Sequence, residues 1–135
     1  MYANPVVYLD SRDGLLRLAM RADAVISGIF GIAGLAGWMP EFSGATRAFE
    51  YGVDSFFVVY GVIVLGLAAL PPVLRTGIGV VVANLLYTAA AVVLVVEHLV
   101  PLTASGMVFA TASAVYTLAF AQLQYLGWRR VKRSR

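Results

Sequence analysis

The sequence predicts an all-α integral membrane protein: a single domain, residues 1–135, in which four transmembrane helices form a bundle with both termini in the cytoplasm. Of the 135 residues, 61% are hydrophobic and 13% are charged, whereas soluble domains are about half apolar and a quarter charged. The chain also has four long stretches without Asp, Glu, Lys or Arg, and its basic residues gather beside the expected helix ends. These observations exclude an ordinary soluble domain.

The charge-free stretches are long enough to cross a bilayer. A helix needs about 20 apolar residues to span roughly 30 Å of hydrocarbon at 1.5 Å per residue. The stretches cover residues 24–40, 55–74, 76–96 and 98–128. The first is short, but apolar residues extend it backward to Leu15. We therefore expect helices at about residues 13–38, 50–70, 76–99 and 103–129.

Prolines and capping residues mark the ends of these helices. Asp54 or the stretch 43–50 can start the second helix, Thr76 can cap the third and Thr103 can cap the fourth. The prolines that follow the first, second and third helices are Pro40, the pair Pro71–Pro72, and Pro101.

Basic residues set the expected orientation, because Lys and Arg are retained on the cytoplasmic side. With both termini inside, only Arg47 of the ten basic residues lies outside. The other nine are Arg12, Arg17, Arg21, Arg75, Arg129, Arg130, Lys132, Arg133 and Arg135. Aromatic residues agree with this orientation, since Trp38 falls at the outer edge and Trp128 at the inner one.

Composition narrows the function classes. The chain has no cysteine, which excludes thiolate chemistry. Its net charge of +3 lies at the expected membrane edges, which favours lipids over nucleic acid as partners.

Ser113 and Thr117 share a helix face without a neighbouring base, so nucleophilic catalysis has no support. A metal site at His98 and Glu97 would need ligands from three segments, and a hydrated interfacial cluster is simpler. We expect no enzyme, no cofactor and no metal site.

Asp23 is the charge that needs an explanation. Arg17 and Arg21 can extend to the lipid headgroups, because helical side chains lean toward the cytoplasmic N-terminus. Asp23 lies about 12 Å beyond Leu15 at 1.5 Å per residue, and its short side chain cannot reach water. It therefore needs a partner or a proton, and Ser27 is its only polar neighbour one turn along the helix.

Polar residues of other helices lie near the depth of Asp23. Asn84 falls at a similar depth, and Gln122 and Gln124 fall slightly shallower. We favour hydrogen bonds between helices that fix the packing. The alternative is a titrating Asp23 that couples a proton to the movement of a cation. The candidate residues for this layer, by binding or by packing, are Arg21, Asp23, Asn84, Gln122 and Gln124.

Small residues recur at helical spacing, and such residues let membrane helices approach closely. Packing within one chain is the favoured interpretation, and a homo-oligomer or a larger membrane complex is the alternative. The residues are Gly28, Gly31, Gly34 and Gly37 in the first helix and Gly106, Ala110 and Ala114 in the fourth.

Three short motifs stand out: Arg-x-Asp-Ala at residues 21–24, Ala-Asn at 83–84 and Gln-Leu-Gln-Tyr-x-Gly at 122–127. With these motifs the chain resembles a group of small uncharacterised bacterial four-helix integral membrane proteins, over most of its length. The resemblance implies four helices in a bacterial inner membrane and brings no assigned activity. It also implies importance for Arg21, Asp23, Asn84 and Gln124.

The expected function is that of a non-enzymatic membrane protein, either a structural or accessory subunit or a lipid-associated scaffold. The alternative is a small proton-coupled transporter that uses Asp23. Such a transporter would be similar in size and helix count to the small multidrug-resistance exporters, which carry a buried acid in their first helix. Here the acid lies close to Arg17 and Arg21, which would repel a cation.

Overall fold

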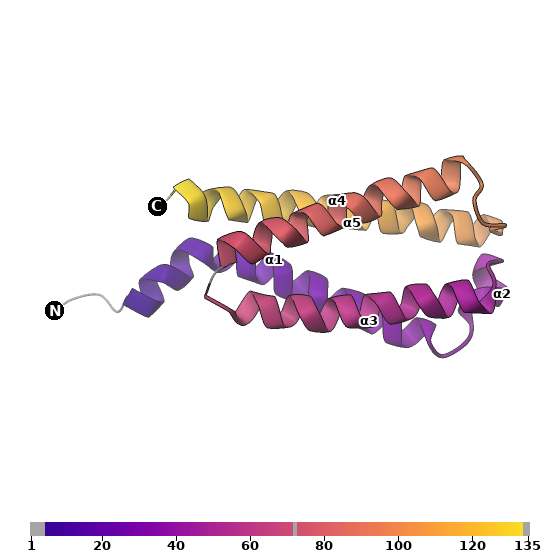
Figure 1. Cartoon of the computed structure of the whole chain (residues 1–135), viewed down its shortest axis with the longest axis horizontal. Helices are drawn as coiled ribbons and strands as arrows, with labels where there is room; N and C mark the ends of the chain where they lie inside the picture. The colour runs from indigo at the N-terminus through magenta and orange to yellow at the C-terminus, as the bar shows by residue number, and fades with distance from the viewer. Residues whose placement is uncertain (1–4, 72, 134–135) are drawn as a thin grey trace.

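The computed structural model describes residues 5–71 and 73–133, with side chains from residue 13 onward. It contains four long helices and one short one, and the described residues include no β-strand, which confirms the all-α class. The helices are α1 Pro5–Gly34, α2 Met39–Ser43, α3 Arg47–Ala69, α4 Val73–Val96 and α5 Ala104–Arg133 (Figure 1).

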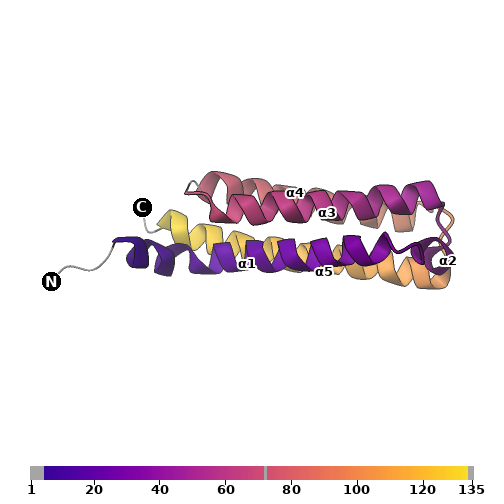
Figure 2. The ribbon, with the colours of Figure 1, turned by 90° about the horizontal axis from the view of Figure 1, so that it is seen from below.

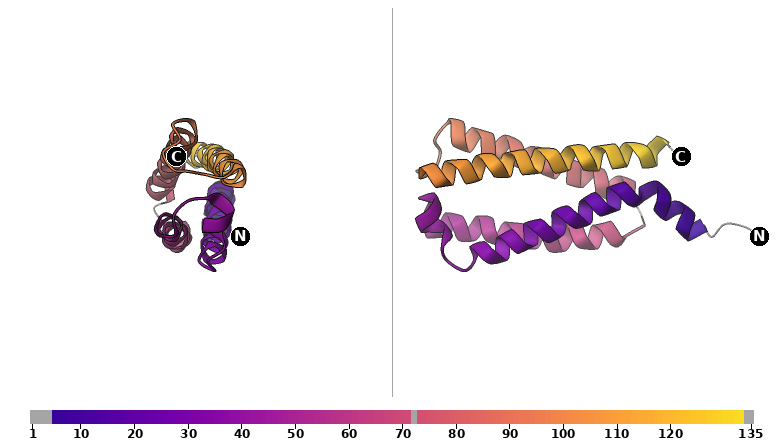
Figure 3. Two further views of the ribbon diagram at one scale, coloured as in Figure 1. Left: turned by 90° about the vertical axis from the view of Figure 1, so that its right-hand side faces the viewer. Right: turned by 180° about the vertical axis from the view of Figure 1, so that it is seen from behind.

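The four long helices run side by side along the molecule. α1 packs most extensively against α3, α4 packs against α5, and α1 also packs against α5, whereas α3 and α4 share a smaller interface. In Figure 2, α3 and α4 lie along one side and α1 and α5 along the other. The start of α1 and the end of α5 lie at one end of this bundle, and α2 lies at the opposite end (Figure 3).

Within the part of the chain that the structure describes, three helices are long and apolar enough to cross a membrane, namely α3, α4 and α5. Their outward faces carry large exposed hydrophobic side chains, as does that of α1. Contiguous apolar surface of this kind suits lipid contact and not water. The helices thus indicate a membrane protein. Exposed examples are Leu18, Ile32, Val62, Leu86 and Val108.

The end of α1 differs from the expected position at residue 38. The helix ends at Gly34, and Gly37 turns the chain with a φ of +94°. The Trp38 indole N–H donates to the Ala33 carbonyl at 2.7 Å across this turn. The short α2, which was not expected from the sequence, follows with Pro40 in its first turn, where a missing backbone N–H costs nothing.

Threonine caps start α3 and α5. The Phe49 N–H donates to Thr46 Oγ1 at 3.2 Å, so α3 starts within the expected stretch 43–50 and Asp54 lies inside the helix. The Gly106 N–H donates to Thr103 Oγ1 at 3.0 Å, which confirms Thr103 as the cap of α5.

The expected cap at Thr76 is wrong. α4 starts three residues earlier, at Val73, and Thr76 lies within its first turn. The reason is packing: Val73 is only 1% exposed and belongs to the core near the chain termini, so the helix begins directly after the proline pair. Tertiary contacts have overridden the local capping signal.

Glycines allow close approach between helices of this chain. A Cβ on Gly31 or Gly34 would overlap Asp54 of α3, and one on Gly106 would overlap the Ser43 backbone of α2. A Cβ on Gly127 would likewise overlap the Leu16 backbone. Contacts within one chain therefore account for Gly31, Gly34 and Gly106, whereas a Cβ on Gly28 would meet open space. A homo-oligomer stays a prediction.

Candidate functional site

Asp23 lies at the centre of the bundle and is 0% exposed. α1 directs this side chain toward the other three long helices. Three donors converge on Oδ2: the Tyr60 hydroxyl of α3 at 2.6 Å, the Asn84 amide of α4 at 2.9 Å and the Gln124 amide of α5 at 3.0 Å. One carboxylate oxygen thus joins α1 to every other long helix.

The second oxygen, Oδ1, is also occupied. It accepts hydrogen bonds from the Tyr116 hydroxyl at 2.9 Å and the Ser27 hydroxyl at 3.1 Å. The Asn84 amide makes a further bond, to Gln124 Oε1 at 2.9 Å. We call this group the Asp23 cluster; its members are Asp23, Ser27, Tyr60, Asn84, Tyr116 and Gln124.

The cluster surrounds the Asp23 carboxyl group with hydrogen-bonding groups. Two amides and three hydroxyls point at its two oxygens. Among the described residues, no Arg or Lys forms an ion pair with it. A buried polar group is tolerated when hydrogen bonds replace its hydration, and five neutral partners do so for Asp23.

Three of the five residues singled out from the sequence meet in this cluster: Asp23, Asn84 and Gln124. Arg21 and Gln122 are exposed and lie outside it. Each is two positions from a cluster member on the same helix, which places it on nearly the opposite face. The common level of Asp23, Asn84 and Gln124 along the bundle was therefore predicted correctly, but this level does not distinguish the inward from the outward face of a helix.

Tyr60 and Tyr116 were not singled out as site residues. A tyrosine hydroxyl buried among apolar side chains needs a hydrogen-bond partner, and for both residues that partner is Asp23. A tyrosine inside an apolar helix was the available signal, but the sequence alone could not show where its hydroxyl points. Ser27, expected as the polar neighbour of Asp23, does donate to it.

Arg17 does not extend to the headgroups as expected. Its Nη1 donates to the carbonyls of Ala68 at 2.6 Å and Leu70 at 2.9 Å, at the end of α3, and its Nε pairs with Asp13 at 2.8 Å. Helix C-termini leave carbonyls without partners, and a guanidinium satisfies them well. Arg17 therefore fastens α1 to the end of α3.

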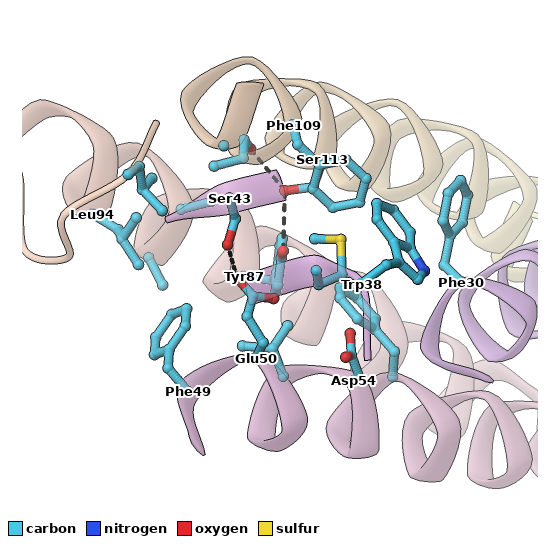
Figure 4. A pocket seen from close by; sticks show the side chains of 18 residues that line it. Phe30, Trp38, Ser43, Phe49, Glu50, Asp54, Tyr87, Leu94, Phe109 and Ser113 are labelled. Atoms are coloured by element: carbon cyan, nitrogen blue, oxygen red, sulfur yellow. Dashed lines mark hydrogen bonds between the residues drawn. The ribbon is translucent and has the colours of Figure 1, made fainter. Parts of the chain in front are cut away.

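A second set of buried polar residues lies in a pocket at the end of the bundle that carries α2. There a pocket of about 160 Å³ opens among α1–α5, and it is lined mainly by apolar and aromatic side chains (Figure 4). Two acids of α3, Glu50 and Asp54, also line it.

His98 and Glu97, the residues considered from the sequence for a metal site, are exposed. No His, Asp or Glu side chains among the described residues form a group of three or more that could hold a metal ion.

Comparison of the chain with family models, curated proteins and solved structures found no match. The functional argument therefore depends on the geometry of the Asp23 cluster and of the pocket.

Proposed function

We propose that this chain is a multi-pass protein of the bacterial inner membrane that serves as a non-enzymatic structural or accessory subunit in contact with membrane lipids. All four long helices, α1 included, cross the bilayer, and both termini are cytoplasmic. The placement of charge supports this topology. The N-terminal part of α1, the start of α4 and the end of α5 lie at the same end of the bundle (Figure 1), and these segments contain eight of the nine basic residues of the described chain.

The charges of α1 are compatible with a membrane span. Asp23 is enclosed by the other helices, and Arg17 is bound to the end of α3. Of Arg17, Arg21 and Asp23, only Arg21 faces outward. It lies near the proposed cytoplasmic end, where its long side chain can reach the lipid headgroups. α1 therefore exposes to lipid only a charge that can leave the hydrocarbon.

The hydrogen bonds to both oxygens of Asp23 are the observation that supports a structural role. A group that takes up and releases a proton or a substrate needs access to water and an acceptor site that is free. Asp23 has 0% exposure and five donors on its two oxygens. It therefore suits a role in holding the four helices together, as buried polar groups do between membrane helices.

The alternative is the proton-coupled transporter that uses Asp23. In that case the helices would have to separate during each cycle to expose the carboxylate. Asp23→Asn would then abolish proton-coupled uptake into vesicles, while Gln122→Ala, a change at an exposed polar residue of similar depth, would leave uptake intact. A structural subunit shows no such uptake in either variant.

Mild-detergent extraction from the native membrane tests the proposal. The mass of the intact assembly and the identity of its components are measured. We expect a stoichiometric second protein or tightly retained lipid. A bare chain without lipid, or vesicle uptake that depends on Asp23, would overturn the proposal.

A further inference from the structure

The pocket of Figure 4 has features that the Asp23 cluster does not explain. It lies at the end of the bundle away from both termini. Aromatic rings from α1, α3, α4, α5 and the α1–α2 turn surround a volume of about 160 Å³. A cavity of about 150 Å³ is enough to hold benzene, so a ligand with one ring fits. The rings are those of Phe30, Trp38, Phe49, Phe57, Tyr87 and Phe109.

Two acids lie in this apolar wall. Glu50 and Asp54 are each 5% exposed and sit one turn apart on α3, on the face that lines the pocket. No Lys or Arg lines the pocket, and Arg47, the nearest basic residue along the chain, is exposed. Two buried acids at i and i+4 repel each other when both are ionised. Their placement favours a positively charged ligand.

One oxygen of the Asp54 carboxyl group lacks a hydrogen-bond partner within the described part of the chain. Glu50 accepts a hydrogen bond from the Ser43 hydroxyl, but Oδ2 of Asp54 is buried and unpaired. The hydroxyls of Tyr87 and Ser113 are bonded, the first to the second at 3.0 Å and the second to a backbone carbonyl. The pocket therefore offers a carboxylate but no free hydroxyl to satisfy it.

Gly34 explains how Asp54 is held there. A side chain at position 34 would overlap the Asp54 carboxylate, so the glycine provides the space that it occupies. Figure 4 shows Asp54 projecting from α3 toward the side chains of the pocket. Leaving a buried polar atom unpaired costs free energy, which a bound donor would recover.

We infer that this pocket binds a small organic ammonium ion with one apolar ring. The ammonium N–H groups donate to Asp54 and Glu50, and the apolar part packs against the aromatic rings, whose faces also attract a cation. In the proposed topology the site is reached from the non-cytoplasmic side. The inference does not depend on the proposed function, because binding here does not involve the Asp23 cluster.

Binding of benzylamine to the full chain in mild detergent tests the inference by calorimetry and by thermal melting. Benzyl alcohol and benzoate, of similar size but neutral and negative, serve as comparison ligands. We expect benzylamine to bind at least tenfold more tightly than either. Asp54→Asn and Glu50→Gln should each weaken benzylamine binding about tenfold or more, while Glu41→Gln, a change at an exposed acid at the same end, should leave it unchanged.

Asp54→Asn also separates ligand binding from a structural role. If the Asp54 carboxylate serves to bind a ligand and not to stabilise the fold, the ligand-free Asp54→Asn protein melts at the same or a higher temperature than the ligand-free parent. The variant also loses the stabilisation that benzylamine gives the parent. Equal binding of benzyl alcohol and benzylamine would contradict the inference. So would benzylamine binding that survives both acid substitutions, or the absence of binding in the parent.

Discussion

Asp23 places a carboxyl group inside an apolar bundle, and among the described residues no Arg or Lys forms an ion pair with it. Its donors are two amides and three hydroxyls, which carry no net charge and cannot be lost by titration near neutral pH. An arginine in their place would have added a charge to desolvate. The arrangement is therefore a low-cost way to join four helices through one residue.

Single donors to Asp23 can be removed without changing the packing volume much. We expect Tyr60→Phe and Tyr116→Phe each to lower the free energy of unfolding by about 1 kcal/mol. Asp23→Leu should lower it by about 3 kcal/mol or more, because five donors then lose their acceptor. Thermal or denaturant unfolding in mild detergent measures these changes.

A double-mutant comparison gives the prediction its control. In the Asp23→Leu background, Tyr60→Phe should cost nothing further, because its acceptor is already gone. Tyr125→Phe, at an exposed tyrosine that stacks on Trp128, should leave stability unchanged. Equal losses for Tyr60→Phe in both backgrounds would show that its hydroxyl does not act through Asp23.

For single residues, the sequence identified the polar side chains within the helices, but not whether each one faces the inside or the outside of the bundle. Asp23, Asn84 and Gln124 could be grouped because helix geometry converts sequence position into depth. The rotation of each helix about its axis depends on which apolar faces pack together. That rotation separates Gln124, which is 0% exposed, from the exposed Gln122.

Individual helices were predicted better in their interiors than at their ends. Thr103 was recognised as a cap, since a threonine before an apolar run is a strong signal. The five-residue α2 was missed, because Pro40 was interpreted as the end of one helix and also suits the first turn of another. The end of α1 at Gly34 was obscured by the apolar residues that follow it.

Arg17 connects two elements, and its removal should weaken that connection. We expect Arg17→Ala to lower the free energy of unfolding by about 2 kcal/mol, since the Ala68 and Leu70 carbonyls lose a charged donor. Chemical unfolding in detergent measures the loss. Asp13→Ala removes the ion pair but keeps both carbonyl bonds, and should cost clearly less. Equal losses in the two variants would place the stabilisation in the ion pair.

At the scale of the whole molecule, composition and the position of charges were enough to predict helices suited to a membrane. They were not enough to show which helices pair. Extensive packing of α1 on α3 depends on glycines such as Gly31 and Gly61, whose partners lie on the other helix of the pair. Such contacts between distant residues leave no local pattern in the sequence.

The proposed topology can be tested directly because the chain contains no cysteine. Single cysteines at two exposed positions report the two sides: Glu41→Cys at the α2 end and Lys132→Cys at the end of the termini. A membrane-impermeant maleimide should label Glu41→Cys in intact cells and Lys132→Cys only after lysis. The reverse pattern would invert the orientation, and labelling of both in intact cells would exclude the four-span arrangement.

The order in which the helices are synthesised matters for Asp23. Among the hydrogen-bond partners of Asp23, Ser27 and Tyr60 are synthesised first, and Asn84 follows in α4. Tyr116 and Gln124 come last, 93 and 101 residues after Asp23. In the proposed four-span arrangement, a nascent chain that has inserted α1, α3 and α4 therefore holds a carboxyl group with two of its partners still missing. Insertion of α5 completes that set, so its arrival is the step that commits the protein to its final assembly in the bilayer.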